Sequence, residues 1–308
     1  MNIPSNASPE SPVESQVLAP AVIPATRRMY WSVRRELWES RSIYIAPLTV
    51  AAVFLFGFLI SLVRLPGKMR AELAANPVHQ HTFLEQPYFF AAGLIMVTVF
   101  IVGVFYCLDA LHSERRDRSI LFWKSLPVSD LTTVVSKASI PLVVLPLLTV
   151  GITAATQLIM ILLSSAVLLV SGVSDAPLWG HFSPFQMSLV LIYHFLTMHV
   201  LGYAPVYGWL LLVSAWARRA AILWATLPLL AIGVVEKIAF NSSYFAAMLK
   251  SVFVGGTEAA APGGAPMDLM TQLAPHNFLS SPGLWIGLAV TAAFLAAAAR
   301  LRRYRGPI

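Results

Sequence analysis

Two adjacent ionisable residues, Glu236 and Lys237, lie inside a long apolar run of the chain. A charge in such a place is expensive, and it commonly marks a substrate or ion pathway. Successive helix positions point about 100° apart, so we do not expect these two side chains simply to pair with each other. Both are also close enough to the end of the run to reach the membrane surface instead. They are therefore a candidate intramembrane polar site, with surface snorkelling as the alternative.

The histidines of the sequence are not arranged as a metal-binding site. His194 and His199 are five positions apart in an apolar run, and they would point about 140° apart on a helix, so they do not converge on one ion. We expect them to pack or to bond between helices. His79, His81 and Glu85 are a thin set of ligands without a fixed scaffold. We predict no metal and no cofactor in this chain.

Standard catalytic motifs are missing from the sequence. The pair Gly67-Lys68 lacks the upstream glycine and the following Ser or Thr of a phosphate-binding loop. The chain also contains no HExxH, GxSxG or CxxC pattern. We therefore predict no catalytic residue and no enzymatic activity, and any ATP must be bound by another chain.

Composition sets the class of protein. Of 308 residues, 57% are hydrophobic and only 11% are charged, against about 25% charged in ordinary soluble domains. This predicts an all-α polytopic membrane protein, and the alternating strands of a β-barrel are absent from the sequence. The net charge of +7 comes from bases beside apolar runs, which favours a role in topology over nucleic-acid binding. The apolar runs fall at 43–63, 88–108, 139–171, 187–213, 221–240 and 283–300.

The distribution of Lys and Arg predicts six spans with both termini cytoplasmic. With six spans, 16 bases lie on one side of the membrane and 4 on the other, with Lys237 left inside a span. Bases gather on the cytoplasmic side of membrane proteins. The run 139–171 would measure about 50 Å as a helix, so it is either two short spans or one long tilted helix. Splitting it would divide the bases almost evenly, which favours one helix.

Three segments frame these spans. Residues 1–25 are predicted to be a disordered tail, and 26–42 a cytosolic interfacial helix; residues 43–308 form the transmembrane domain. The helix has an aromatic and apolar side (Met29, Tyr30, Trp31, Val33, Leu37, Trp38) and a charged side opposite (Arg28, Arg35, Glu36, Glu39). In the outer loop 241–282, the spacing of apolar residues over 245–253 predicts a short re-entrant or interfacial helix.

The loop 109–138, between the second and third runs, is the most charge-dense part of the chain. Its residues 113–131 read SERRDRSILFWKSLPVSDL. Four consecutive apolar residues, Ile120 to Trp123, cover most of a helix circumference, so a further surface is needed to bury them. Aromatic residues beside arginines are favoured at protein interfaces. Pro127 should end one short helix, and Ser129 or Asp130 should cap the next. The alternative is an ordinary positively charged loop with aromatics at the headgroups.

The segment ERRDRSILFWKSLPVSDLTTVVSK, residues 114–137, resembles the cytosolic loop of ABC-2 type transporter permeases. Glu114 matches the acidic residue that begins the loop in that family. Residues 125–129 match its SLPVS segment, and Lys137 matches its closing lysine. Arg118-Ser119 stands where the family often has Gly-Thr, so the local backbone can differ there.

The resemblance implies a permease subunit of an ATP-driven exporter in a bacterial cytoplasmic (inner) membrane, moving a hydrophobic or amphiphilic substrate. It implies a second permease copy, identical or different, and a separate ABC ATPase that binds ATP and Mg. The ATPase would dock on Glu114, Arg115, Arg116, Arg118, Ile120, Phe122, Trp123, Lys124 and Pro127. Two other hypotheses remain: an ion-coupled secondary transporter using Glu236 and Lys237, and a non-transporting scaffold or sensor.

Overall fold

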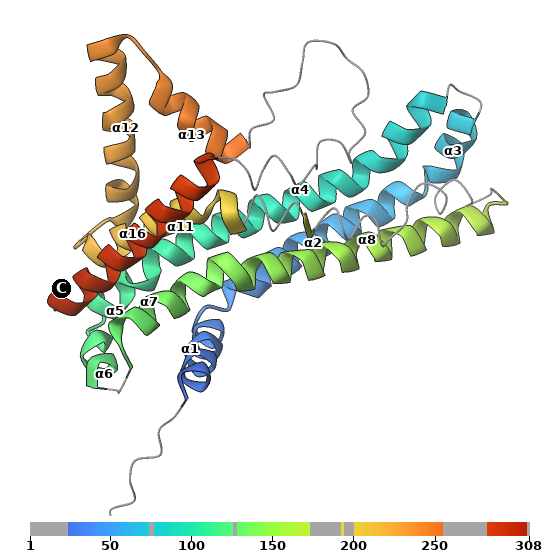
Figure 1. Ribbon diagram of the computed structural model, residues 1–308. Helices are drawn as coiled ribbons and strands as arrows, with labels where there is room; N and C mark the ends of the chain where they lie inside the picture. The colour runs from blue at the N-terminus through green and yellow to red at the C-terminus, as the bar shows by residue number, and fades with distance from the viewer. Residues whose placement is uncertain are drawn as a thin grey trace, which may run out of the picture.

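The computed structural model describes residues 24–73, 77–125, 128–172, 192–193, 200–254 and 282–306. In these ranges every regular element is a helix, and the helices form an elongated assembly (Figure 1). The elements are α1 (Ala25–Glu39), α2 (Ser42–Leu62), α3 (Leu65–Leu73), α4 (Pro77–Ala110), α5 (His112–Arg116), α6 (Ser119–Ser125), α7 (Asp130–Ser139), the π-helix η1 (Ile140–Val144), α8 (Leu145–Val170), α11 (Ala204–Trp216), α12 (Ala221–Phe240), α13 (Tyr244–Val254) and α16 (Pro282–Tyr304).

Five helical stretches in the described ranges are long and apolar enough to cross a membrane: Ser42–Leu62, Gln86–Arg116, Asp130–Val170, Ala221–Phe240 and Pro282–Tyr304. Each agrees with one of the predicted apolar runs. The remaining run, 187–213, is described only at 192–193 and from 200 onwards, where α11 supplies a shorter apolar helix. Six spans and the side on which the termini lie therefore stay predictions.

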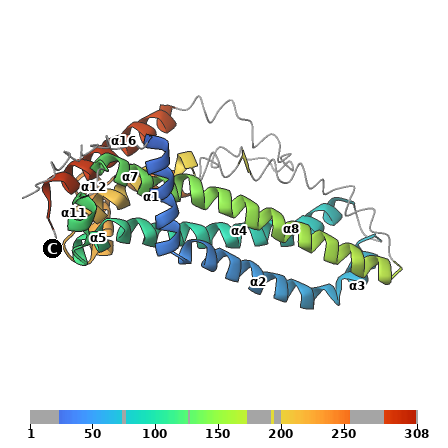
Figure 2. The ribbon, with the colours of Figure 1, turned by 90° about the horizontal axis from the view of Figure 1, so that it is seen from below.

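Helices α2, α4 and α8 lie side by side along the molecule (Figures 1 and 2). Five of the eleven side chains that α8 buries bear a hydroxyl group: Thr149, Thr153, Thr156, Ser164 and Ser165. Small side chains allow close helix packing in a membrane. The hydroxyls of Thr149 and Thr156 donate to carbonyls one turn back, at 2.7 Å each. Buried residues of α4 and α8, among them Tyr88, Ala91, Met160 and Leu168, pack here in one apolar cluster against Phe54 and Phe58 of α2.

The third apolar run forms one continuous helical stretch of 41 residues, Asp130–Val170. Its five-residue π-helical segment, Ile140–Val144, contains Pro141, which has no N–H for a regular helical bond. At about 1.5 Å per residue the stretch is roughly 60 Å long, twice the thickness of the hydrocarbon core. It begins as predicted: the Ser129 side chain accepts a hydrogen bond from Thr132 N at 3.1 Å. A single helix therefore extends from the loop through the core.

The C-terminal helix α16 packs closely on α11. A side chain on Gly208 would meet Thr291 at 3.3 Å, and one on Gly287 would meet Pro205 at 3.2 Å. Both glycines therefore permit the close approach of the two helices.

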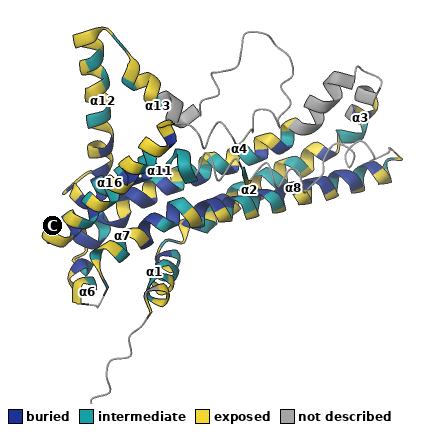
Figure 3. Cartoon of the chain, viewed as in Figure 1, coloured by how far each residue is buried: buried dark blue, intermediate teal, exposed yellow. Residues whose placement is uncertain are grey.

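By contrast, α12 stands away from the body and is exposed along most of its length (Figure 3). Only Ala221 and Ala225 of this helix are buried. The chain reverses at its end into α13, which agrees with the short helix predicted after the fifth run.

Other predictions fall outside the described residues. The proposed tail lies there as far as residue 23, and so do 255–281 of the outer loop, Pro127, His194 and His199. His79, His81 and Glu85 belong to α4, which begins at Pro77 rather than at 88. Among the described residues, no group of three or more His, Cys, Asp and Glu side chains could hold a metal.

Candidate functional site: a buried charge cluster behind the loop

Four charged side chains from four separate helices are buried at one end of the long helix. Glu36 of α1, Glu114 of α5, Lys137 of α7 and Arg302 of α16 are each at most 6% exposed. We call these four residues the charge cluster. Burying a charge costs several kcal/mol unless it is paired, so their mutual arrangement decides whether these helices can pack together.

The charges of the cluster alternate in space. Lys137 Nζ lies 2.8 Å from Glu36 Oε1 and 3.2 Å from Glu114 Oε1. Arg302 Nη2 donates to the other oxygen of Glu114 at 3.0 Å. The Tyr106 hydroxyl of α4 donates to Glu36 Oε2 at 2.9 Å, so both carboxylates are held through both oxygens.

Two further residues extend the cluster to the surface. Arg302 Nη1 donates to Asp130 Oδ1 at the start of α7, at 2.6 Å. Arg35 Nη2 lies 3.2 Å from Glu36 Oε1 and 3.4 Å from Glu114 Oε1. The Arg35 guanidinium also covers the ring of Trp123, 3.5 Å from its centroid, which is cation–π geometry. The loop aromatic is thereby attached to α1.

The loop helices are also anchored to the ends of α11 and α16. Buried Arg115 donates through Nη1 to the carbonyls of Ala215 at 2.8 Å and Ala217 at 3.3 Å. Lys124 Nζ lies 3.3 Å from the Arg303 carbonyl. The carbonyls that end a helix carry partial negative charge, so cations are favoured there. These bonds fix the loop as part of the folded body.

Residues 119–125 divide their apolar side chains between the interior and the surface. Ile120 is buried in the chain itself, whereas Leu121 and Phe122 are 59% and 60% exposed. Leu131, at the start of α7, is 56% exposed. We call Leu121, Phe122 and Leu131 the exposed loop face.

The remaining predicted docking residues differ in placement. Arg116 is exposed and pairs with its neighbour Asp117 at 3.0 Å. Arg118 is exposed at a turn with φ of 58°, a backbone conformation that glycine adopts more easily. That turn is where the resembling family often has a glycine. The docking role of all these residues stays a prediction.

Glu236 and Lys237 are not brought together. The Glu236 carboxylate turns to the start of α13 and accepts hydrogen bonds from Ser242 Oγ (2.8 Å), Tyr244 N (2.7 Å) and Phe245 N (2.9 Å). It satisfies N–H groups that a helix start leaves unpaired. Lys237 is exposed in the last turn of α12. Glu236 thus has a structural role at the bend between the two helices.

The sequence analysis missed half of the charge cluster. Glu36 was placed on the charged side of the segment 26–42, opposite the aromatics, and in the structure Glu36 is buried while Tyr30, Trp31 and Trp38 are exposed. The charged side of α1 therefore faces the protein at Glu36, whose carboxylate lies 2.8 Å from the buried cation Lys137. Arg302 was counted only as a base of the tail. One signal was available: Glu36 lies between Val33 and Leu37, the two α1 residues that pack on the core.

By length and composition, the long apolar helices are those of a helical membrane protein. The feature to explain is the charged loop, whose buried Glu114 forms ion pairs with α1, α7 and α16. Comparison of the chain with protein-family models, curated proteins and solved structures gave no match.

Proposed function

We propose that this chain is the permease subunit of an ATP-driven transporter of the ABC-2 type. In this proposal a separate cytosolic ATPase docks on the exposed loop face, and the substrate is hydrophobic or amphiphilic. The subunit works with a second permease copy in a bacterial cytoplasmic membrane. The observation that carries the proposal is the charge cluster, because it links the loop to the helix that enters the core.

The contacts describe a path for force. Glu114, in the loop, shares Lys137 with Glu36 and shares Arg302 with Asp130. Lys137 lies about two helical turns after the first residue of the continuous stretch Asp130–Val170. A force applied to α5 and α6 therefore moves the long helix together with α1 and α16, and the loop does not move independently of them.

The exposed loop face provides the apolar surface that binds the ATPase in this proposal. Phe122 is exposed, and so are the loop cations Arg116 and Lys124. Aromatic and arginine side chains provide most of the binding energy at protein interfaces, and truncating such an anchor costs about 2 kcal/mol or more. A loss of that size weakens binding roughly thirtyfold.

The test is co-purification of the full-length chain from native membranes, with P-loop proteins identified by mass spectrometry. We expect Phe122→Ala to reduce the amount of the co-purified P-loop ATPase by at least about tenfold. Phe240→Ala is the matched control, because Phe240 is also exposed but ends α12 on the outer side of the proposed topology. Equal recovery of the ATPase with both variants would show that the loop is not its docking site.

Transport in reconstituted vesicles separates the rival hypotheses. We expect substrate movement to need ATP and the co-purified ATPase, and to continue when the proton gradient is collapsed. Transport that follows the proton gradient without ATP would establish the ion-coupled mechanism instead. A chain that binds a cytosolic protein but moves nothing would be a scaffold.

A further inference from the structure

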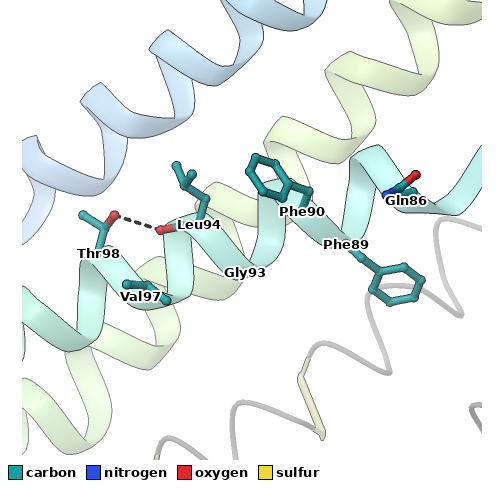
Figure 4. Close-up of a pocket in the computed structure, with 7 residues that line it drawn as sticks. All are labelled: Gln86, Phe89, Phe90, Gly93, Leu94, Val97 and Thr98. Carbon is teal, nitrogen blue, oxygen red and sulfur yellow. Dashed lines mark hydrogen bonds between the residues drawn. The ribbon is translucent and has the colours of Figure 1, made fainter.

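An apolar groove of about 670 Å³ runs between α2 and α4. Val53, Phe54, Gly57 and Phe58 form the α2 side, and Phe90 and Leu94 form the α4 side. Figure 4 shows that Phe90 and Leu94 leave α4 on one side and Phe89 on the other. A second hollow, of about 820 Å³, lies against α4 beside Gly93 and shares Gln86, Phe90 and Leu94 with the groove. An apolar channel of this kind suits a hydrocarbon chain.

The length of the groove fits one leaflet of a membrane. Its lining on α2 extends from Thr49 to Ser61, which is about 18 Å along a helix. Half of the hydrocarbon core is about 15 Å thick. Ser61 is next to the last residue of α2, Leu62, so, with α2 spanning the membrane as proposed, the groove begins near one surface and reaches the midplane.

Gly57 lines the groove, and Gly93 lines the second hollow. A side chain on Gly57 would meet no other atom within 4 Å, and the same is true of Gly93. Unlike Gly208, Gly57 is therefore not needed for contact between the helices that the structure describes. A larger residue here would fill the groove without displacing the chain around it.

The polar groups of the groove are concentrated where it meets the surface. Gln86 is exposed at that end, beside Ser61. Arg64 follows Ser61 by three residues, donates its backbone N–H to the Ser61 carbonyl at 3.1 Å, and is exposed. Arg64 belongs to the turn that follows α2, so it lies at the end of the helix that carries Ser61 and Gly57. An apolar channel with an amide and a guanidinium at its mouth is complementary to an anionic amphiphile.

We propose that the groove between α2 and α4 binds one acyl chain of an anionic phospholipid, in the leaflet at the C-terminal end of α2. Arg64 and Gln86 contact the headgroup. This lipid site goes beyond the permease function and does not depend on it. A second copy of this chain is the competing occupant, and the experiment below distinguishes the two.

The acyl-chain part is tested with the full-length protein in detergent micelles that contain spin-labelled phosphatidylglycerol, whose immobilised fraction is measured. We expect Gly57→Leu to lower the affinity at least tenfold, because the leucine side chain occupies the groove. Gly151→Leu is the matched control, since Gly151 of α8 is exposed and has no atom within 4 Å of an added Cβ. Equal binding by the two variants would overturn the proposal.

The headgroup part compares phosphatidylglycerol with phosphatidylcholine. We expect Arg64→Gln to remove most of the preference for phosphatidylglycerol, and Arg41→Gln, at the opposite end of α2, to leave it in place. A wild-type protein that binds both lipids equally would disprove the anionic preference. If Gly57→Leu instead dissociates an oligomer while lipid immobilisation is unchanged, the groove is a subunit interface and the lipid proposal is wrong.

Discussion

The replacement Lys137→Met tests the charge cluster most directly. Methionine preserves most of the length of the lysine side chain but removes the cation shared by Glu36 and Glu114. The two carboxylates then lose the nearer of the two cations that they share, while Arg35 Nη2 still lies 3.2 Å from Glu36 Oε1 and 3.4 Å from Glu114 Oε1. Glu36 keeps the Tyr106 hydroxyl, and Glu114 keeps Arg302.

The expected cost follows from the burial of the pair. Removing one partner of a buried ion pair destabilises a protein by about 3–5 kcal/mol, because the other charge remains buried. Lys137 is 2% exposed and Glu36 is 4% exposed, so water screens the pair little. The double variant Glu36→Gln/Lys137→Met should therefore lose less stability than the sum of the single variants, by about 1–3 kcal/mol.

The assay is reversible unfolding of the full-length chain in mixed micelles with increasing sodium dodecyl sulfate. Lys124→Met is the matched control, because Lys124 is an exposed lysine of the same loop that reaches only main-chain carbonyls. We expect its effect to stay within about 0.5 kcal/mol, as for most surface substitutions. If Lys137→Met behaves like this control, or if the single effects simply add, the cluster is not an interacting unit.

Two other predictions follow from the contacts. Glu236→Ala should uncap α13 and speed amide hydrogen exchange over 244–254, because the N–H groups of Tyr244 and Phe245 lose their acceptor. Lys237→Ala should leave this exchange unchanged, and unchanged exchange in Glu236→Ala would contradict the capping role. Gly208→Val should destabilise the chain by about 1–3 kcal/mol, because the valine side chain separates α11 from α16. The control Gly93→Val should be tolerated, since an added side chain meets no other atom there. Comparable unfolding midpoints for these two variants would show that the close approach at Thr291 is unimportant.

Much of the architecture could be predicted from the sequence alone. Uncharged runs of about twenty residues must pair their backbone polar groups in helices when they enter a membrane, and five of the six predicted runs form helices long and apolar enough to cross one. Local chemistry likewise set the start of α7, because Ser129 is within reach of Thr132 N in any helix that begins there. The single long helix over 130–170 also agrees with the distribution of basic residues.

Tertiary structure alone decided which charges meet. Lys137 and Glu36 are 101 positions apart, and Arg302 and Glu114 are 188 apart. Helical periodicity is a local property and carries no information about such distant partners. In the loop, four consecutive apolar residues point around the whole helix, so their pattern could not show that Ile120 faces the protein while Phe122 faces outward. The sequence by itself therefore determined the helices and the polarity of the chain, and the packing of four helices determined where the charges are buried.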